Sequence, residues 1–319
     1  MTAPAIEIEH VSKRYGDVAV LSDVSLAIDE GETFALIGPS GCGKSTTMKL
    51  MNRLVEPTSG TVRVRGKDVS AIDVAALRLG IGYVIQDVGL FAHYTIARNV
   101  GLVPELLGWP ADKREARVNE LLEIVGLPAP KFGERYPRQL SGGQRQRAGI
   151  ARALAADPEV VLLDEPFSAL DPITRERMQD EFLALSERLG KTFVFVTHDI
   201  FEAVRLADRI GVMRDGKLVQ CGTPKEIVHA PADAEVAALL GRHRYQLKLM
   251  TTRVDDLARA RGRAAGEADG KALSVTPDAN AWDALARLET ENAEHVRVEL
   301  PGAARLLSRD DLLGGAGAA

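Results

Sequence analysis

The sequence predicts an α/β fold in which a parallel sheet is combined with helices and followed by a smaller α+β domain. Two observations indicate the sheet. Short apolar runs at residues 33–37, 160–163 and 192–197 are typical of strands, and helical patterns lie between them. The length indicates the second domain, because 319 residues suit one large domain and a smaller one. Ligands are therefore expected at the carboxyl ends of the strands, where open α/β sheets bind them.

The composition is that of an ordinary globular protein, with 45% hydrophobic residues and a net charge of -5. Acidic and basic residues are mixed along the chain, so no overall field favours nucleic acid as a partner. No apolar stretch approaches the ~20 residues that span a bilayer, and residues 1–10 lack the pattern of a signal peptide. The two cysteines, Cys42 and Cys221, suit a reducing compartment. We expect a cytosolic protein without a disulfide framework.

The chain is organised around a glycine-rich turn between the first of these strands and a helix. It fits the pattern G-x-x-x-x-G-K-[ST] and consists of Gly38, Pro39, Ser40, Gly41, Cys42, Gly43, Lys44 and Ser45. Backbone N–H groups and a positive helix end converge in such a turn, which suits the phosphates of a nucleotide. We expect Lys44 to reach the β- and γ-phosphates and Ser45 to bind Mg²⁺. The alternative, a turn that binds nothing, is disfavoured by the flanking strand and helix.

Two amphipathic strands are expected ahead of this loop, at residues 6–11 and 24–28, where apolar and polar residues alternate. Tyr15 lies in the segment that joins them. An aromatic ring ahead of a phosphate loop can stack on a purine, a contact that contributes ~1–3 kcal/mol per base in nucleic-acid systems. A surface tyrosine in a hairpin is an equally good interpretation. Behind the loop, the helix is expected to continue through residues 50–55, and residues 61–65 to form another strand.

Polar side chains follow three predicted strands at the edge where the sheet would bind a ligand. Gln86 ends the strand at residues 81–86, Asp164 and Glu165 follow another, and His198 follows a third. We expect Asp164 to bind the metal and Glu165 to polarise a water for attack on the γ-phosphate. Gln86 could contact Mg²⁺ or that water, and a neutral His198 could bind the γ-phosphate. The alternatives are a solvated amide, two loop carboxylates and a structural histidine.

Residues 92–156 are mostly helical in pattern and predict a helical insert. Near its end stand Leu140, Ser141, Gly142, Gly143 and Gln144, followed by a strongly helix-forming segment. Ser141 and Gln144 make a capping box, which by itself indicates only a well-capped helix. Each glycine costs ~1 kcal/mol relative to alanine in a helix interior, and a cap does not require them. Bare N–H groups at this helix start suit a phosphate that another molecule brings in.

Together these motifs resemble the ATP-binding subunit of an ABC transporter over residues 6–240. The resemblance implies a P-loop NTPase core of the RecA type with a helical and an antiparallel β subdomain, which binds ATP and Mg²⁺. The implied ATP-binding residues are Tyr15 against adenine, the loop at residues 38–45, Thr46, Ser141, Gly142, Gly143, Gln144 and Asp171 at the end of the D-loop. The implied roles near the reaction are Ser45, Gln86 and Asp164 for the metal, Glu165 as catalytic carboxylate, Gln86 as the Q-loop and His198 as the switch histidine.

The resemblance also implies partners. In that family two subunits close head to tail, so each ATP lies between one chain's phosphate loop and the other chain's Ser141, Gly142 and Gly143. The implied partners are a second copy of this chain, transmembrane permease subunits and, indirectly, an extracytoplasmic solute-binding protein. The chain would then sit peripherally on the cytoplasmic face of the inner cell membrane. A permease helix is expected beside residues 87–94, where Phe91 and Tyr94 either contact it or belong to the core of the insert.

Residues 46–54, 81–86, 89–91 and 103–109 are similar to importers of quaternary-amine osmoprotectants. This likeness implies ATP-driven uptake of glycine betaine, choline, carnitine or proline betaine. One alternative is an importer of another solute, such as a polyamine or an amino acid. A second is a soluble ABC ATPase, which would usually carry two cassettes or a long coiled coil. A nucleotide sensor without turnover would lack Glu165.

The composition shifts after the predicted cassette, which we place at residues 1–241. Residues 242–270 are charged and alanine-rich and predict a helical or loose linker. Residues 271–313 follow the order strand, helix, strand and short end helix, and are similar to a single cystathionine-β-synthase-type (CBS) repeat. That likeness implies either ligand sensing or a purely structural role in dimerisation. Residues 314–319 are small and are expected to be a disordered tail.

Overall fold

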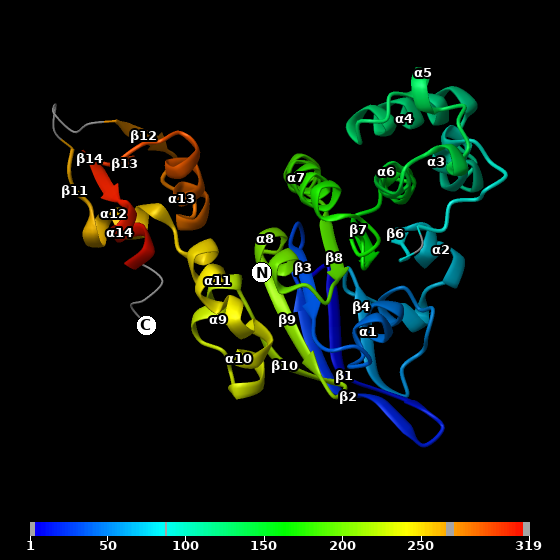
Figure 1. Cartoon of the computed structure of the whole chain (residues 1–319). Helices are drawn as coiled ribbons and strands as arrows, with labels where there is room; N and C mark the ends of the chain where they lie inside the picture. Colours follow the sequence, from blue (N-terminus) through cyan, green and yellow to red (C-terminus); the bar gives the residue numbers. More distant parts are fainter. Residues whose placement is uncertain (1–3, 87, 266–270, 315–319) are drawn as a thin grey trace. The chain divides into compact units, whose positions relative to one another are not determined.

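The computed structural model describes residues 4–86, 88–265 and 271–314. Three expectations fall partly outside them, at Asp87 of the docking segment, residues 266–270 of the linker and residues 315–319 of the tail. The chain divides into two compact units, at residues 1–221 and 222–319 (Figure 1). Within the described ranges, the helices are all too short or too polar to cross a membrane.

The first unit contains the predicted sheet. Its six strands are β3 (Thr33–Ile37), β6 (Ile81–Val84), β7 (Val160–Asp164), β8 (Thr192–Val196), β9 (Arg209–Arg214) and β10 (Lys217–Gly222), in the order β10-β9-β3-β8-β7-β6. The pairs β3–β8, β3–β9, β7–β8 and β6–β7 are parallel. Every residue of β3 and β8 is buried, as expected for strands covered on both faces. The prediction of a parallel sheet is confirmed.

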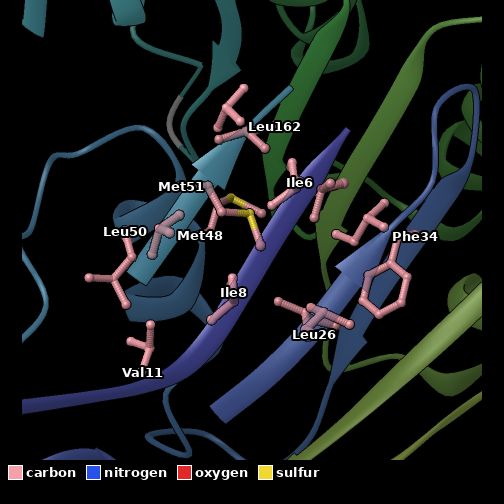
Figure 2. Packing of buried hydrophobic residues seen from close by; sticks show 14 of the residues in the cluster. Ile6, Ile8, Val11, Leu26, Phe34, Met48, Leu50, Met51 and Leu162 are labelled. Carbon is pink, nitrogen blue, oxygen red and sulfur yellow. The ribbon is translucent and has the colours of Figure 1, made fainter. Parts of the chain in front are cut away.

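A second, antiparallel sheet is formed by β1 (Ile6–Tyr15), β2 (Val18–Ile28), β4 (Ser59–Val64) and β5 (Lys67–Asp68), in the order β2-β1-β4-β5. Its apolar face shares one core with α1 (Lys44–Met51), the helix after the phosphate loop. Figure 2 shows Met48 and Met51 of α1 beside Ile6 of β1 and Leu162 of β7. This shared core fixes α1, and with it the phosphate loop, against both sheets. The 3-10 helix η1 (Val69–Ala71) and the α-helix α2 (Val74–Leu79) complete this part.

Helix α1 ends at Met51, four residues before the end that the sequence predicts. Arg53 takes a left-handed backbone conformation, with φ at 49°. Its guanidinium donates to the carbonyl oxygens of Val69 (3.3 Å) and Ile72 (3.1 Å). These tertiary hydrogen bonds turn the chain away from the helix axis, and local helix propensity did not reveal them.

The predicted helical insert is also confirmed. It consists of α3 (Ile96–Leu106), α4 (Ala111–Ile124), α5 (Ala129–Phe132), η2 (Pro137–Gln139) and α6 (Gly142–Leu154). Helices α3, α4 and α6 contact one another, and α6 also contacts β6 of the sheet. The unit further contains α7 (Pro172–Leu189) and α8 (Ile200–Leu206). Helix α6 therefore connects the insert to the strand that precedes Gln86.

The second unit begins with the helices α9 (Pro224–His229), α10 (Ala234–Leu240), η3 (Gly241–His243), α11 (Arg244–Thr251) and α12 (Val254–Arg261). Next come β11 (Arg263–Ala264), β12 (Ala272–Val275), α13 (Ala281–Thr290), β13 (His295–Leu300), β14 (Ala303–Ser308) and α14 (Arg309–Gly314). The sheet order is β11-β14-β13-β12, with β12 and β13 parallel. The CBS likeness of this unit stays a prediction.

Three features of the second unit differ from the expected division of the chain. Part of the expected linker belongs to the core of this unit, because Val254, Leu257 and Ala258 of α12 are buried in one cluster with residues of β13 and α13. A strand that the sequence did not predict, β14, follows a turn in which Gly302 has a φ of 94°. Gly314, the first residue of the expected tail, ends α14.

Candidate functional site

The phosphate loop joins β3 to α1 and requires its glycines. Gly38, Gly41 and Gly43 all have positive φ angles. A Cβ at Gly38 would lie 2.1 Å from the carbonyl oxygen of Met213, so no side chain fits there. Gly43 stands at the N-cap of α1, where no side chain caps the first turn. The first N–H groups of α1 therefore remain available for an anion.

Lys44 is buried at the start of α1, with its amine inside the loop. The Nζ atom donates to the carbonyl oxygens of Gly38 (2.7 Å) and Pro39 (2.9 Å). These bonds hold the ammonium at the mouth of the loop instead of in solvent. It can therefore exchange a loop carbonyl for a phosphate oxygen with little movement of its stem.

Ser45 and Asp164 meet at the carboxyl edge of the sheet. The Ser45 hydroxyl donates to Oδ1 of Asp164 at 3.2 Å. Burial raises the pKa of the Asp164 carboxyl, against the opposing effects of Ser45 and Lys49. A buried anion that is unfavourable by itself is stabilised when a cation binds to it.

This oxygen pair fits Mg²⁺. The ion prefers oxygen ligands and is usually held by one or two carboxylates together with substrate phosphates and waters. Across the residues the structure describes, His, Cys, Asp and Glu form no group of three that would hold a metal by themselves. Ser45 and Asp164 would hold Mg²⁺ jointly with the nucleotide, and the ion would supply positive charge to the phosphate oxygens.

Gln86, Glu165 and His198 come together at the ends of β6, β7 and β8. Nε2 of Gln86 donates to Oε2 of Glu165 at 3.2 Å, and Nδ1 of His198 lies 3.6 Å from the same oxygen. Gln86 stands two residues beyond the end of β6, whereas the prediction had it end the strand. The three side chains also come from adjacent strands, so the predicted meeting at one sheet edge is confirmed.

The backbone of Glu165 is specialised. Its φ is 48°, a left-handed conformation that is uncommon for a residue with a side chain. Its N–H donates to the carbonyl oxygen of Val196 (3.1 Å), and its own carbonyl oxygen accepts from the Ser168 hydroxyl (3.0 Å). These bonds hold the turn, so the carboxylate points across to Gln86 and not along the strand.

The turn that carries His198 is anchored from beneath by buried Glu202. The Thr197 hydroxyl donates to Oε2 of Glu202 (2.5 Å) and accepts from the N–H of Asp199 (3.0 Å). Gln179 of α7 donates to the other oxygen of Glu202 at 3.4 Å. Burial raises the pKa of the Glu202 carboxyl, although the bond from Thr197 opposes the shift.

Replacing Glu202 by glutamine should therefore remove a pH dependence of stability. Because its pKa is raised in the folded protein, the unfolded chain loses this proton first as the pH rises. The free energy of unfolding of the native protein should fall as the pH rises from the ordinary carboxyl pKa through the raised one. Urea unfolding at about pH 4 and about pH 7 should show the variant gaining stability relative to native. Parallel pH profiles would contradict this.

The first turn of α6 carries the predicted capping box. The Gln144 N–H donates to the Ser141 hydroxyl (3.3 Å), and the Ser141 N–H donates to Oε1 of Gln144 (2.9 Å). Packing against α7 requires a glycine at position 143, because a Cβ there would lie 2.9 Å from Cγ2 of Thr174. At Gly142 the nearest atom would be 3.6 Å away, so packing does not require that glycine.

Gly143→Ala is expected to lower the free energy of unfolding by about 1–3 kcal/mol through overpacking. Alanine's better helix propensity acts in the opposite direction by up to about 1 kcal/mol, so a net loss identifies the clash. Thr174→Ser removes the methyl group in question and should recover most of the loss in the double variant. Urea unfolding of the four proteins measures both effects. A single variant as stable as native would show that α6 and α7 do not pack this closely.

Tyr15 lies at the end of a strand and Asp171 at the start of a helix. Tyr15 ends β1 with 51% of its surface exposed, and the Lys13 amine lies 4.8 Å from its ring centre. Its hairpin runs past the phosphate loop, because a Cβ at Gly43 would lie 2.5 Å from Cδ2 of Leu21. Asp171 caps α7, and hydrogen bonds from Thr174 lower its pKa. Their roles toward a nucleotide stay predictions.

Beyond Gln86, an aromatic group marks the segment expected to dock a permease. The ring centres of Phe91 and Tyr94 lie 5.6 Å apart, and those of His93 and Tyr94 lie 4.3 Å apart. Phe91 is 43% exposed. Buried Asn99 holds this loop, donating to the carbonyl oxygens of Phe91 and Tyr94 and accepting from the Phe91 N–H. Asn99 was not predicted, since its only signal in the sequence is a polar residue on the buried face of a helix.

An uncapped helix start beside a half-buried Ser–Asp oxygen pair is the arrangement of a P-loop nucleotide-binding protein. The comparisons agree with this class. A family model described as "ABC transporter" matches residues 21–168. The chain belongs to the family of ABC transporter ATP-binding proteins.

Two relatives and one solved structure illustrate the family. The chain is 52% identical over 240 residues to the "Carnitine transport ATP-binding protein OpuCA" of Listeria monocytogenes, a match that covers 75% of this chain and 60% of the relative. It is 47% identical over 271 residues to the "Glycine betaine uptake system ATP-binding protein YehX" of Escherichia coli, covering 85% and 88%. The dimeric post-hydrolysis structure of the ATP-binding cassette MJ0796 with ADP and Pi is 35% identical, with a TM-score of 0.61, covering 68% and 98%.

These findings confirm the predicted ABC ATPase core. The chain spans 60% of the length of the carnitine relative, which is less than two thirds of that protein.

Proposed function

We propose that this chain is the ATP-hydrolysing subunit of an importer of quaternary-amine compatible solutes, among them glycine betaine, carnitine, choline and proline betaine. The observation that carries hydrolysis is the carboxylate of Glu165, which lies against Gln86 and His198 at the sheet edge. The names of the carnitine and glycine betaine relatives support the solute class. The solute itself would bind elsewhere, since the site described here suits a nucleotide.

The geometry divides the work among the residues of the site. The loop N–H groups and Lys44 would bind the phosphates, and Ser45 and Asp164 would hold Mg²⁺ with them. Glu165 would accept a proton from the attacking water, and Gln86 would orient that water or the carboxylate. His198, whose ring is exposed, would bind the γ-phosphate from the far side. Contacts to the γ-phosphate are absent with ADP, so ATP and ADP can favour different states.

A second copy of the chain would complete the site. The first turn of α6 offers the Ser141 hydroxyl and the N–H groups of Gly142 and Gly143, and packing does not explain Gly142. The related cassette MJ0796 is dimeric with ADP and Pi. We infer that each ATP lies between the loop of one copy and the α6 start of the other.

The permease subunits would dock at Phe91 and Tyr94, on the cytoplasmic face of the cell membrane. The exposed aromatic surface of Phe91 and the Asn99 bonds that hold it in place support this site. A photoreactive residue at position 91 should capture a membrane subunit in cells. Capture of soluble proteins only would contradict docking there.

Uptake measurements test the whole proposal. Cells that lack this chain should lose uptake of radiolabelled glycine betaine, carnitine or choline and regain it with the native chain. The Glu165→Gln variant should not restore it, which separates an energetic role from a structural one. Unchanged uptake of all three solutes without the chain, or restoration by the variant, would overturn the proposal. A polyamine and an amino acid serve as comparison solutes.

A further inference from the structure

One face of α6 runs along the segment that follows Gln86. Gln146, Gly149 and Arg152 stand three residues apart and so share this face. Gln146 lines a cavity of about 130 Å³ together with Gln86 and Glu165. Gly149 leaves room for Val88, because a Cβ there would lie only 2.3 Å from Cγ1 of Val88. The helix is therefore fitted to this segment along two of its turns.

The Arg152 side chain binds the backbone of the same segment. Its guanidinium donates from one nitrogen to the carbonyl oxygen of Val88 (2.7 Å) and from another to that of Gly89 (2.6 Å). Arg152 is half-buried, and this burial lowers the pKa of its guanidinium. Two parallel bonds from one planar group fix orientation as well as position.

The backbone that Arg152 binds has an uncommon conformation. Val88 has a φ of 60°, and Gly89 one of 64°. A left-handed conformation is unfavourable for a β-branched residue and persists only where the surroundings impose it. Three features surround it: the Arg152 bonds, the space above Gly149, and a bond from the Val88 N–H to the carbonyl oxygen of Ile85 at 2.8 Å. Without them, the turn is expected to relax to ordinary φ values and to move Gln86, two residues earlier.

We propose that Arg152 is a positioning residue that sets Gln86 against Glu165 by holding the turn at Val88 and Gly89. The inference rests on the proposed ATPase activity. Helix α6 carries the predicted contact to the partner's ATP at its first turn and Arg152 in its last turn. Its 13 residues therefore connect the contact in the partner's site to Gln86 in the chain's own site.

The test measures kcat and KM for ATP of the full chain with Arg152→Lys, which keeps the charge but loses the two-pronged donor. We expect kcat to fall about 10- to 100-fold, as for a misplaced catalytic group, with KM nearly unchanged. In a Gln86→Ala background the same substitution should have little further effect. Arg147→Lys is the matched control, because Arg147 lies on the same helix but contacts Val125 and Glu181. It should retain native kcat.

The outcomes separate the inference from the proposed function. Absence of ATPase activity in the native chain would overturn both the inference and the proposed function. If the native chain is active, two results would overturn only the positioning role. One is a native kcat for Arg152→Lys, and the other is an equal loss of kcat from this substitution in the native and the Gln86→Ala backgrounds. If Arg152→Lys does not fold, Gly149→Ala is the second test, because it displaces Val88 with Arg152 in place. The Gly149→Ala variant should have a lowered kcat, and adding Val88→Ala should restore it. A native kcat for Gly149→Ala would contradict the inference.

Discussion

Replacing Glu165 by glutamine is expected to lower ATP turnover by about 10²- to 10⁴-fold while leaving ATP binding intact. The amide has the shape of the carboxylate, so the contacts with Gln86 at 3.2 Å and His198 at 3.6 Å can persist. It cannot accept the proton of the attacking water. Steady-state ATPase rates and the affinity for a fluorescent ATP analogue measure the two properties separately.

The same variant also tests closure of the dimer. With hydrolysis blocked, ATP should accumulate between two copies, and sedimentation should show ATP-dependent pairing. Glu159→Gln is a suitable control, because Glu159 is an exposed acid just before β7, at the far end from the site. A near-native rate for Glu165→Gln would contradict its role as base. Absence of pairing with ATP, with or without the permease, would contradict the shared site.

Much of this site was predictable because parallel strands bring their carboxyl ends to one edge. Gln86, Glu165 and His198 follow β6, β7 and β8, which are neighbours in the sheet (Figure 1). Once these segments were interpreted as strands of one parallel sheet, a meeting of the side chains at its carboxyl edge was expected, whereas the order of the strands was not predicted. The phosphate loop was predictable for a different reason, since its glycines and Lys44 form a local pattern.

The hydrogen bonds of Arg152 to the turn at Val88 and Gly89 were not predictable from the sequence. Arg152 and Gly89 are 63 residues apart, and neither belongs to a motif that local spacing reveals. A valine with positive φ contradicts the preference of its residue type, so residue preference did not reveal this turn. The α12 residues of the second unit show the same limit. Their alanine-rich and charged composition indicated a linker, whereas Val254 and Leu257 are buried.

Replacing Lys44 by alanine is expected to weaken ATP binding about 10- to 150-fold, which corresponds to the ~1.5–3 kcal/mol of a hydrogen bond to a charged group. In the folded chain the amine is already desolvated and lies at the loop mouth against Gly38 and Pro39. Little further desolvation is then required when phosphate oxygens arrive. Calorimetric titration with ATP and with ADP measures the loss, which should be larger for ATP because its γ-phosphate adds charge.

Two comparisons distinguish a binding role for Lys44 from a folding role. Lys44→Met keeps most of the buried stem and removes the charge, so it should lose affinity like Lys44→Ala but retain more stability. Lys67→Ala removes an exposed charge from β5 and should leave affinity unchanged. Equal ATP affinity for native and Lys44→Met would remove this residue from the phosphate site. The same affinity loss in Lys67→Ala would attribute the effect to net charge, since both variants lose one positive charge.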